Sequence, residues 1–138
     1  MKFSFNWISE LTSVGISAQE LSGLLTIKTA ESEGVHNFGP HLSRVCAARV
    51  DSVEAIEGSK NVKAVVDTVR YGKKTVVCGA PNCRVGIVTA YVPAGTKLGE
   101  REIRKALIGQ VESDGMLASG AELGLNRDTA GILELEQE

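Results

Sequence analysis

The sequence predicts a mainly β protein, in which residues 39–138 form a small closed barrel and residues 1–38 form an α/β appendage. Short runs of β-branched residues begin after Ser43 and alternate with glycine-containing corners, which is typical of small barrels. No long helical pattern separates these runs, so the alternation expected of a parallel α/β sheet is missing. Before residue 39, the apolar residues instead recur at helical intervals.

Two short helices and one short strand are expected in residues 1–38. Asn6 can cap a first helix that runs through Leu11. The Ser17-Ala18-Gln19-Glu20 segment has the spacing of a capping box and should begin a second helix. The strand is expected at Glu31–Val35. Because about 38 residues rarely sustain a core alone, we expect this appendage to pack loosely or against a second copy.

Five or six short strands should make up the barrel. They are expected at residues 44–53, 62–71, 75–78, 87–92, 103–108 and 111–117. A turn at Tyr71–Lys74 would join the second strand to the third as a hairpin. Asp114–Gly115 indicates a tight turn, because glycine enters positive φ without a Cβ penalty. One helical turn at 121–125 and a terminal strand at 131–135 complete the expected elements.

Basic residues are concentrated in the middle of the chain, although the formal net charge is −2. Residues 60–109 hold ten lysines and arginines against three acidic residues, whereas both flanks are acidic. Phosphate binding depends on the local field, since salt screens charges beyond about 8–10 Å. The pattern fits either a positive nucleic-acid-binding face or a solvated barrel surface whose lysines contact nothing.

Composition and the N-terminal residues indicate a cytoplasmic protein that does not contact a membrane. No run of about 18 apolar residues exists that could span a bilayer, and the N-terminus lacks the apolar stretch of a signal peptide. The three cysteines, Cys46, Cys78 and Cys83, fit reduced thiols. A zinc site made with His36 and His41 is the alternative, but the spacing is not that of a structural zinc knuckle, so buried or loop thiols are favoured.

The chain shows no pattern of catalytic residues. It lacks a nucleophile–base–orienter set, a Walker-type phosphate loop and the Rossmann glycine pattern. Gly79–Asn82 contains Pro81, which lacks the amide donor that a phosphate cradle would use. His36 and His41 are expected to be surface or hinge residues. We therefore expect no catalytic residue, metal site or cofactor in this chain.

Binding is the chemistry that the sequence favours, since small barrels hold nucleic acid on a strand face and its loops. The candidate RNA-binding residues lie near the expected turns and are Lys60, Asn61, Lys63, Arg70, Lys73, Lys74, Asn82, Arg84, Arg104 and Lys105. Within the barrel the only aromatic residues are Tyr71 and Tyr91. This scarcity disfavours base stacking and favours recognition of the backbone and shape of a structured RNA.

Two motifs carry a family resemblance. Residues 78–86 read Cys-Gly-Ala-Pro-Asn-x-Arg-x-Gly, and residues 109–117 read Gly-x-Val-Glu-Ser-x-Gly-Met-Leu. Together with the opening Met1–Trp7 segment, they resemble the N-terminal tRNA-binding region of the β chain of bacterial phenylalanyl-tRNA synthetase. The resemblance covers nearly the whole chain. At the first turn the sequence departs from it, because relatives often read Asn-Ala-Asp-Lys-Leu where this chain has Gly58–Val62.

The resemblance implies an oligonucleotide/oligosaccharide-binding (OB) fold of the EMAP/Myf-like tRNA-binding type in residues 39–138. It implies a module that is itself non-catalytic, in a heterotetrameric ligase that uses ATP and Mg²⁺ and whose catalytic core lies in the other chain. The implied partners are tRNA, the α subunit and the rest of the β chain, with no DNA. Residues 1–38 would be part of a neighbouring domain that sequence beyond Glu138 completes.

Two alternatives remain open beside a tRNA-binding module of a synthetase. In the first, the chain is a structural protein-interaction module within the synthetase, and its basic face meets an acidic protein surface. In the second, it is a free-standing tRNA-binding protein.

Overall fold

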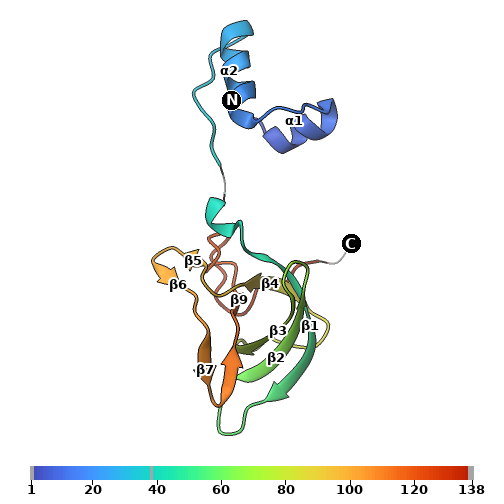
Figure 1. Cartoon of the computed structure of the whole chain (residues 1–138), viewed down its shortest axis with the longest axis vertical. Coiled ribbons are helices and arrows are strands. Elements are labelled where there is room, and N and C mark those ends of the chain that lie inside the picture. The colour runs from blue at the N-terminus through green and yellow to red at the C-terminus, as the bar shows by residue number, and fades with distance from the viewer. Residues whose placement is uncertain (1, 38, 137–138) are drawn as a thin grey trace. The chain divides into compact units, whose positions relative to one another are not determined.

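The computed structural model describes residues 2–37 and 39–136. The chain divides into two compact units, Met1–Phe38 and Gly39–Glu138. Figure 1 shows the helices of the first unit and the strands of the second. The second unit is mainly β, as the sequence predicts. Within the described ranges, no helix combines the length and apolar character needed to cross a membrane.

The first unit contains helices α1, Phe5–Thr12, and α2, Ala18–Lys28. Ser4 caps α1, because its backbone is extended and its hydroxyl accepts a hydrogen bond from the Trp7 amide at 3.4 Å. The assignment of the cap to Asn6 is therefore wrong, since Asn6 already lies inside the helix. The capping box of α2 is confirmed: Ser17 Oγ accepts from the Glu20 amide, and the Glu20 carboxylate accepts from the Ser17 amide.

The expected strand at Glu31–Val35 is not formed, since this segment joins no ladder in the described part of the chain. Hydroxyl groups of α2 hold it instead. Thr26 Oγ1 accepts a hydrogen bond from the Ser32 amide at 3.0 Å, and the Ser22 and Ser32 hydroxyls lie 2.7 Å apart. No described residue of this unit is buried. Its most exposed large apolar side chains are Phe3, Trp7, Leu11 and Ile27.

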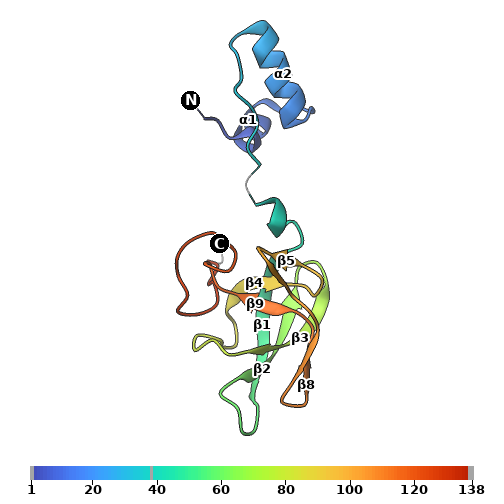
Figure 2. The same ribbon diagram turned by 90° about the vertical axis from the view of Figure 1, so that its left-hand side faces the viewer.

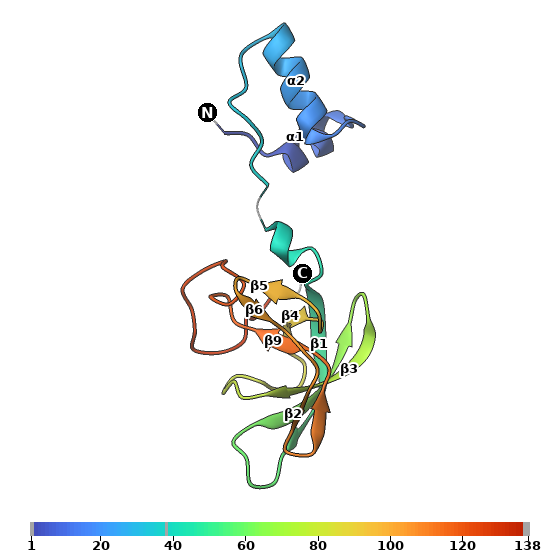
Figure 3. The same cartoon turned by 60° about the vertical axis from the view of Figure 1, so that its left-hand side comes forward.

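Five antiparallel strands form the main sheet of the second unit, in the order β3-β2-β1-β4-β9. They are β1 Cys46–Ala55, β2 Val62–Thr68, β3 Gly72–Cys78, β4 Val88–Val92 and β9 Met116–Ala118. β1 pairs with both β2 and β4, and a register shift between Val50 and Ser52 is a bulge of the kind that bends a strand. Figures 2 and 3 show the sheet curling around its inner face.

The strands expected at 103–108 and 111–117 are formed only in part, as a small hairpin and the start of β9, and a second small hairpin precedes them. β5, Lys97–Leu98, pairs with β6, Arg101–Glu102, and β7, Ala106–Ile108, pairs with β8, Val111–Ser113. The chain then changes partner at Asp114–Gly115, because β9 pairs with β4. Gly115 has a φ of +110°, and a Cβ there would lie 2.5 Å from the Val92 carbonyl oxygen. The Asp-Gly corner therefore redirects the chain and is not a hairpin turn.

The sheet curls without closing into the predicted barrel. No ladder joins β3 to β9 in the portion that the structure describes. Instead, the Asp114 amide donates to the Thr75 carbonyl at 2.8 Å, and the Val77 amide donates to the Ser113 hydroxyl at 2.9 Å. Ser113 thus presents a side chain to β3 where a paired strand would present its backbone, and Asp114 adds one backbone hydrogen bond. The structure thus shows a curled half-barrel, and it does not show the closed barrel that the sequence predicts.

β1, β2 and β3 contribute alternate residues to the core, as the period of two requires, whereas residues 89–92 of β4 are all buried. The most deeply buried of the alternating residues, each no more than 1 % exposed, are Ala48 and Val50 of β1, Ala64 and Val66 of β2, and Val76 of β3. Tyr91 is 1 % exposed and packs against the half-buried Tyr71, with ring centroids 6.0 Å apart. Both aromatic side chains of the β unit therefore serve the core and are not displayed as a stacking surface.

The C-terminal segment of the described chain is extended but forms no ladder of its own. The Leu133 amide donates to the Ala118 carbonyl at 2.8 Å, and the Leu135 amide donates to the Val88 carbonyl at 2.9 Å. The expected terminal strand is therefore reduced to single hydrogen bonds along β9 and β4.

Candidate nucleic-acid interface

The structure separates the candidate RNA-binding residues into distinct places. Lys60 and Asn61 lie in the β1–β2 loop, and Lys63 follows near the start of β2. Arg70 and Lys73 lie around the β2–β3 turn, at the opposite end of that strand. Because a strand rises about 3.3 Å per residue, the two ends of β2 are about 20 Å apart. These two groups therefore cannot contact the same phosphate.

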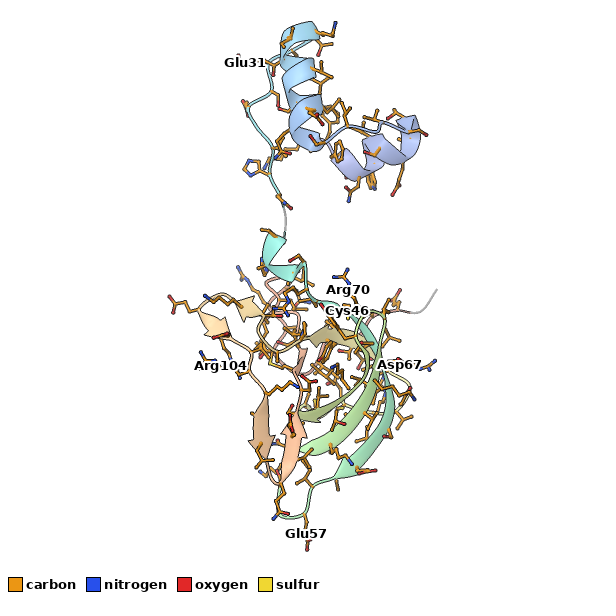
Figure 4. The ribbon with its side chains drawn as sticks, viewed as in Figure 1. Glu31, Cys46, Glu57, Asp67, Arg70 and Arg104 are labelled. Atoms are coloured by element: carbon orange, nitrogen blue, oxygen red, sulfur yellow. The ribbon has the colours of Figure 1, made fainter. Side chains whose placement is uncertain are left out.

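Another group surrounds Asp114, at the corner between β8 and β9. Lys74 Nζ lies 2.9 Å and Lys105 Nζ 3.4 Å from Asp114 Oδ2. The hydrogen bond from Lys74 is the main reason why the pKa of the Asp114 carboxyl is lowered. Arg104 adjoins Lys105, and Figure 4 shows it on a different side of the unit from Arg70. Lys105 also lies 4.0 Å from Glu112, so the two ammonium groups of this corner face two carboxylates.

A cleft of about 560 Å³ opens beside the Asp114 corner, and residues from β3, β9 and the 129–132 segment line it. Val77, Ile103 and Met116 are among the apolar residues of its lining, and Arg101, Arg104 and Glu122 are among the charged ones. The cleft lies along the edge where β3 and β9 are not joined by a ladder. The lining thus combines apolar side chains with two arginines, each of which is paired with a glutamate of the same lining.

Most of the candidate cations are already paired with carboxylates. Besides the two lysines at Asp114, the ion pairs are Lys63–Glu54 at 2.8 Å, Lys73–Asp51 at 2.9 Å, Arg84–Glu134 at 2.8 Å and Arg104–Glu102 at 2.7 Å. All but one of these carboxylates come from the acidic flanks of the sequence, which fold back onto the basic segment. Arg70 donates to the Ser43 carbonyl at 2.7 Å. Among the described residues, Lys60 alone of these cations forms neither an ion pair nor a side-chain hydrogen bond.

The exposed ion pairs still permit phosphate binding. Such pairs contribute about 0–1 kcal/mol, because water and salt screen them. The side chains of Arg104 and Lys73 are 78 % and 68 % exposed, so each can exchange its carboxylate for a phosphate with little loss. Lys74 is 29 % and Asp114 21 % exposed, and their pair joins β3 to the β8–β9 corner. We therefore interpret Lys74 as mainly structural.

Asn82 and Arg84 hold the C-terminal segment. Asn82 Oδ1 accepts a hydrogen bond from the Ile132 amide, and Asn82 Nδ2 donates to the Ile132 carbonyl, both at 2.9 Å. Gly131 permits this approach, because a Cβ there would lie 2.2 Å from Asn82 Oδ1. Arg84 forms two hydrogen bonds with Glu134, which together with Asn82 lower the pKa of that carboxyl to about 2. Both candidates are thus engaged within the protein.

Asn61 and Arg101 have surroundings in the folded chain that the sequence did not indicate. The Asn61 carboxamide lies against the loop after β3, since a Cβ on Gly79 would be 2.7 Å from Asn61 Oδ1. Arg101, which was not among the candidates, is part of the cleft lining and reaches Glu122 at 3.8 Å. Its only signal in the sequence is its place in the basic segment. The spatial neighbours of Arg101 depend on the β5–β6 hairpin, which the sequence did not predict.

The histidines and cysteines of the zinc alternative are not gathered into one cluster. Across residues 2–37 and 39–136, no group of three or more His, Cys, Asp or Glu side chains is placed to hold a metal ion. His41 hydrogen-bonds to the Leu123 carbonyl at 3.2 Å. The Cys78 and Cys83 side chains hydrogen-bond to each other.

The fold and the cleft define a class of protein: a small curled β module with exposed, paired cations beside a cleft, and a separate helical unit. No protein-family model matches the chain. The chain is 54 % identical over 136 residues to the phenylalanine–tRNA ligase beta subunit of Solibacter usitatus. It is 39 % identical over 138 residues to the same subunit of Xanthomonas axonopodis pv. citri, and 37 % identical over 137 residues to that of Dechloromonas aromatica.

Each of these alignments covers 98 % of this chain. The chain belongs to the phenylalanine–tRNA ligase beta subunit family, whose N-terminal region it matches. It spans only 16–17 % of the length of these relatives. The family resemblance seen in the two motifs is therefore confirmed.

Proposed function

We propose that residues 39–138 form an OB-fold tRNA-binding module that supports ATP-dependent phenylalanylation of tRNA and is itself non-catalytic. The observation that carries the proposal is the 54 % identity, over 98 % of the chain, to a subunit of an enzyme that by its name is a tRNA ligase. On this proposal the partners in the cytoplasm are tRNA, an α subunit and the rest of the β chain. ATP and Mg²⁺ serve the parent ligase and not this segment.

The sheet supports the OB assignment. An OB fold is a five-stranded, partly open barrel that binds oligonucleotides on its second and third strands and the adjoining loops. Here β1 pairs with β2 and β4, while β3 and β9 form the two edges of the sheet. These edges approach each other through the Asp114–Thr75 backbone hydrogen bond.

The side chains favour recognition of the RNA backbone. Tyr71 and Tyr91 pack into the core, so base stacking has no aromatic platform on the β unit. Phosphates instead meet exposed cations, which form weak pairs that a phosphate can replace. The cations that meet this requirement best are Arg104 and Lys105, beside the cleft, with Lys60 and Lys73 as further contacts.

Binding of tRNA to the 138-residue chain at low and at moderate salt tests the proposal. Replacing Arg104 and Lys105 by glutamine should weaken binding and reduce the salt dependence, by a slope of about 0.7–0.9 per lost phosphate contact. The matched control is Lys2→Gln with Lys28→Gln, which removes the same charge from the helical unit. Absence of tRNA binding at both salt concentrations would refute the proposal. An equal effect of the control pair would show that net charge alone matters.

A second candidate function is a structural protein-interaction module. Phe3, Trp7 and Leu11 of the helical unit favour it, because all three are large apolar side chains that are mostly exposed. Two sets of variants in the complete ligase separate the two functions: glutamine at Arg104 and Lys105, and serine at Phe3, Trp7 and Leu11. Loss of tRNA affinity with normal subunit assembly supports the tRNA-binding module. Loss of assembly with normal tRNA affinity supports the interaction module.

A further inference from the structure

Cys78 and Cys83 form a thiol pair that is not among the proposed tRNA contacts. Cys78 ends β3 and is 5 % exposed, and Cys83 is half-buried after the Gly79–Asn82 loop. The loop turns back on itself, because the Cys83 amide donates to the Ala80 carbonyl at 3.2 Å. Both cysteines pack in the same apolar cluster, and their side chains hydrogen-bond to each other.

Cys78 also lines the 560 Å³ cleft. A small reagent that enters the cleft can therefore approach its sulfur, although most of the side chain is buried. We propose that Cys78 and Cys83 are a hydroperoxide-reactive dithiol that closes reversibly into a disulfide. This modification site is independent of the proposed tRNA-binding function.

The local environment makes Cys78 the attacking thiol and Cys83 the resolving thiol. The hydrogen bond from Cys83 is the largest cause that lowers the pKa of Cys78, to about 7, and burial opposes it. The backbone at Ala80 lowers this pKa further, while the Glu122 carboxylate, the charged group that acts on Cys78, raises it. The same hydrogen bond raises the pKa of Cys83. Near neutral pH, about half of Cys78 is therefore thiolate, with Cys83 as the proton donor beside it.

The chemistry balances with a hydroperoxide as the only oxidant. The Cys78 thiolate attacks one peroxide oxygen, so that an S–O bond forms while the O–O bond breaks. The leaving oxygen takes a proton and departs as an alcohol or as water. The Cys83 sulfur then attacks the sulfenic sulfur, an S–S bond forms, and the S–O bond breaks. The released hydroxide combines with the Cys83 proton to leave as water.

The product ring encloses Asn82, the residue that binds Ile132. Oxidation would therefore fix the loop that holds the C-terminal segment, and a thiol reductant would release it.

The pKa of Cys78 sets the expected rate of its reaction with a hydroperoxide, relative to that of an ordinary thiol. At pH 7 the thiolate fraction of a thiol with a pKa of about 7 exceeds that of an ordinary thiol about fifteenfold. The lower intrinsic nucleophilicity offsets about fivefold of this gain, which leaves about a threefold advantage.

Peptide mapping of the intact chain after exposure to hydrogen peroxide tests the proposal. Trypsin releases residues 75–84 with both cysteines and residues 45–49 with Cys46, which serves as an internal control. After alkylation, we expect peptide 75–84 to be unalkylated and lighter by two hydrogen atoms, while peptide 45–49 is alkylated. Dithiothreitol should restore two alkylation sites. Full alkylation of peptide 75–84 at a peroxide concentration that already oxidises Cys46 would overturn the proposal.

The Cys83→Ala variant supplies a second test, and the pH dependence of the wild-type chain supplies one that needs no variant. Without Cys83, Cys78 should pass to the sulfinic acid, and its oxidation at pH 7 should slow about threefold. In the wild-type chain, the rate of disulfide formation should rise with pH through an inflection near 7. An inflection at the pKa of an ordinary thiol, about 8.5, would contradict the role of Cys83.

Discussion

Replacing Asn82 by alanine tests the contact that holds the C-terminal segment to the half-barrel. The change removes the acceptor for the Ile132 amide and the donor for the Ile132 carbonyl. Ile132 is only 5 % exposed, so water replaces these partners poorly. With about 1 kcal/mol for each hydrogen bond, the free energy of unfolding should fall by about 2 kcal/mol. The melting temperature should fall by about 10 °C, since a unit of this size loses roughly 4–8 °C per kcal/mol.

Urea unfolding followed by circular dichroism measures this loss. Asn37→Ala, at an exposed position of the helical unit, is the matched control and should change stability by less than about 0.5 kcal/mol. Hydrogen exchange adds a local measurement, because the Ile132 amide should lose its protection in Asn82→Ala before the core strands do. A loss no greater than that of the control, with Ile132 still protected, would refute the role assigned to Asn82.

Three other predictions follow from the half-barrel. Ser113→Ala removes the acceptor for the Val77 amide and should cost about 1–2 kcal/mol in urea unfolding; no loss would contradict the bridging role. Gly115→Ala forces a Cβ against backbone at a φ of +110° and should cost about 3 kcal/mol or prevent folding, which expression and thermal melting measure. The pKa of Glu134 is lowered to about 2 chiefly by Arg84, so its stabilisation is present above pH 4–5 and is lost as the pH falls towards 2. The melting temperature of Glu134→Gln should therefore depend less on pH in this range than that of the wild-type chain. An unchanged pH dependence would contradict a stabilising Arg84–Glu134 pair.

The charge distribution of the folded chain narrows the proposed binding surface. The sequence shows a strongly basic middle segment, but its carboxylate partners come mainly from residues on either side of it. Lys73 meets Asp51, and Arg84 meets Glu134. The segment therefore does not present one continuous positive face. What remains is a set of exposed, weakly paired cations, of which those beside the cleft are the best placed to meet phosphate.

Local features were predictable from the sequence because their partners lie within a few residues. The Ser17–Glu20 capping box and α2 follow from side chains three positions apart. β1 and β2 follow from alternating apolar residues, whose period does not depend on the rest of the chain. The two motifs around Cys78 and Gly115 were also sufficient to identify the family. The start of α1 was predicted wrongly at Asn6, because serine and asparagine both suit an N-cap and the structure places Ser4 there.

Closure of the sheet, neutralisation of the basic segment and the roles of individual side chains depend on contacts between distant residues. Lys74 meets Asp114 across 40 positions, and Asn82 meets Ile132 across 50. A local sequence pattern does not predict which distant carboxylate or backbone group a side chain will contact in the curled sheet. The sequence by itself determined a mainly β unit of this family with a basic middle segment. The tertiary structure alone decided that no ladder joins β3 to β9 in the described residues and that most of the cations are paired. Both depend on contacts between residues that lie far apart in the sequence.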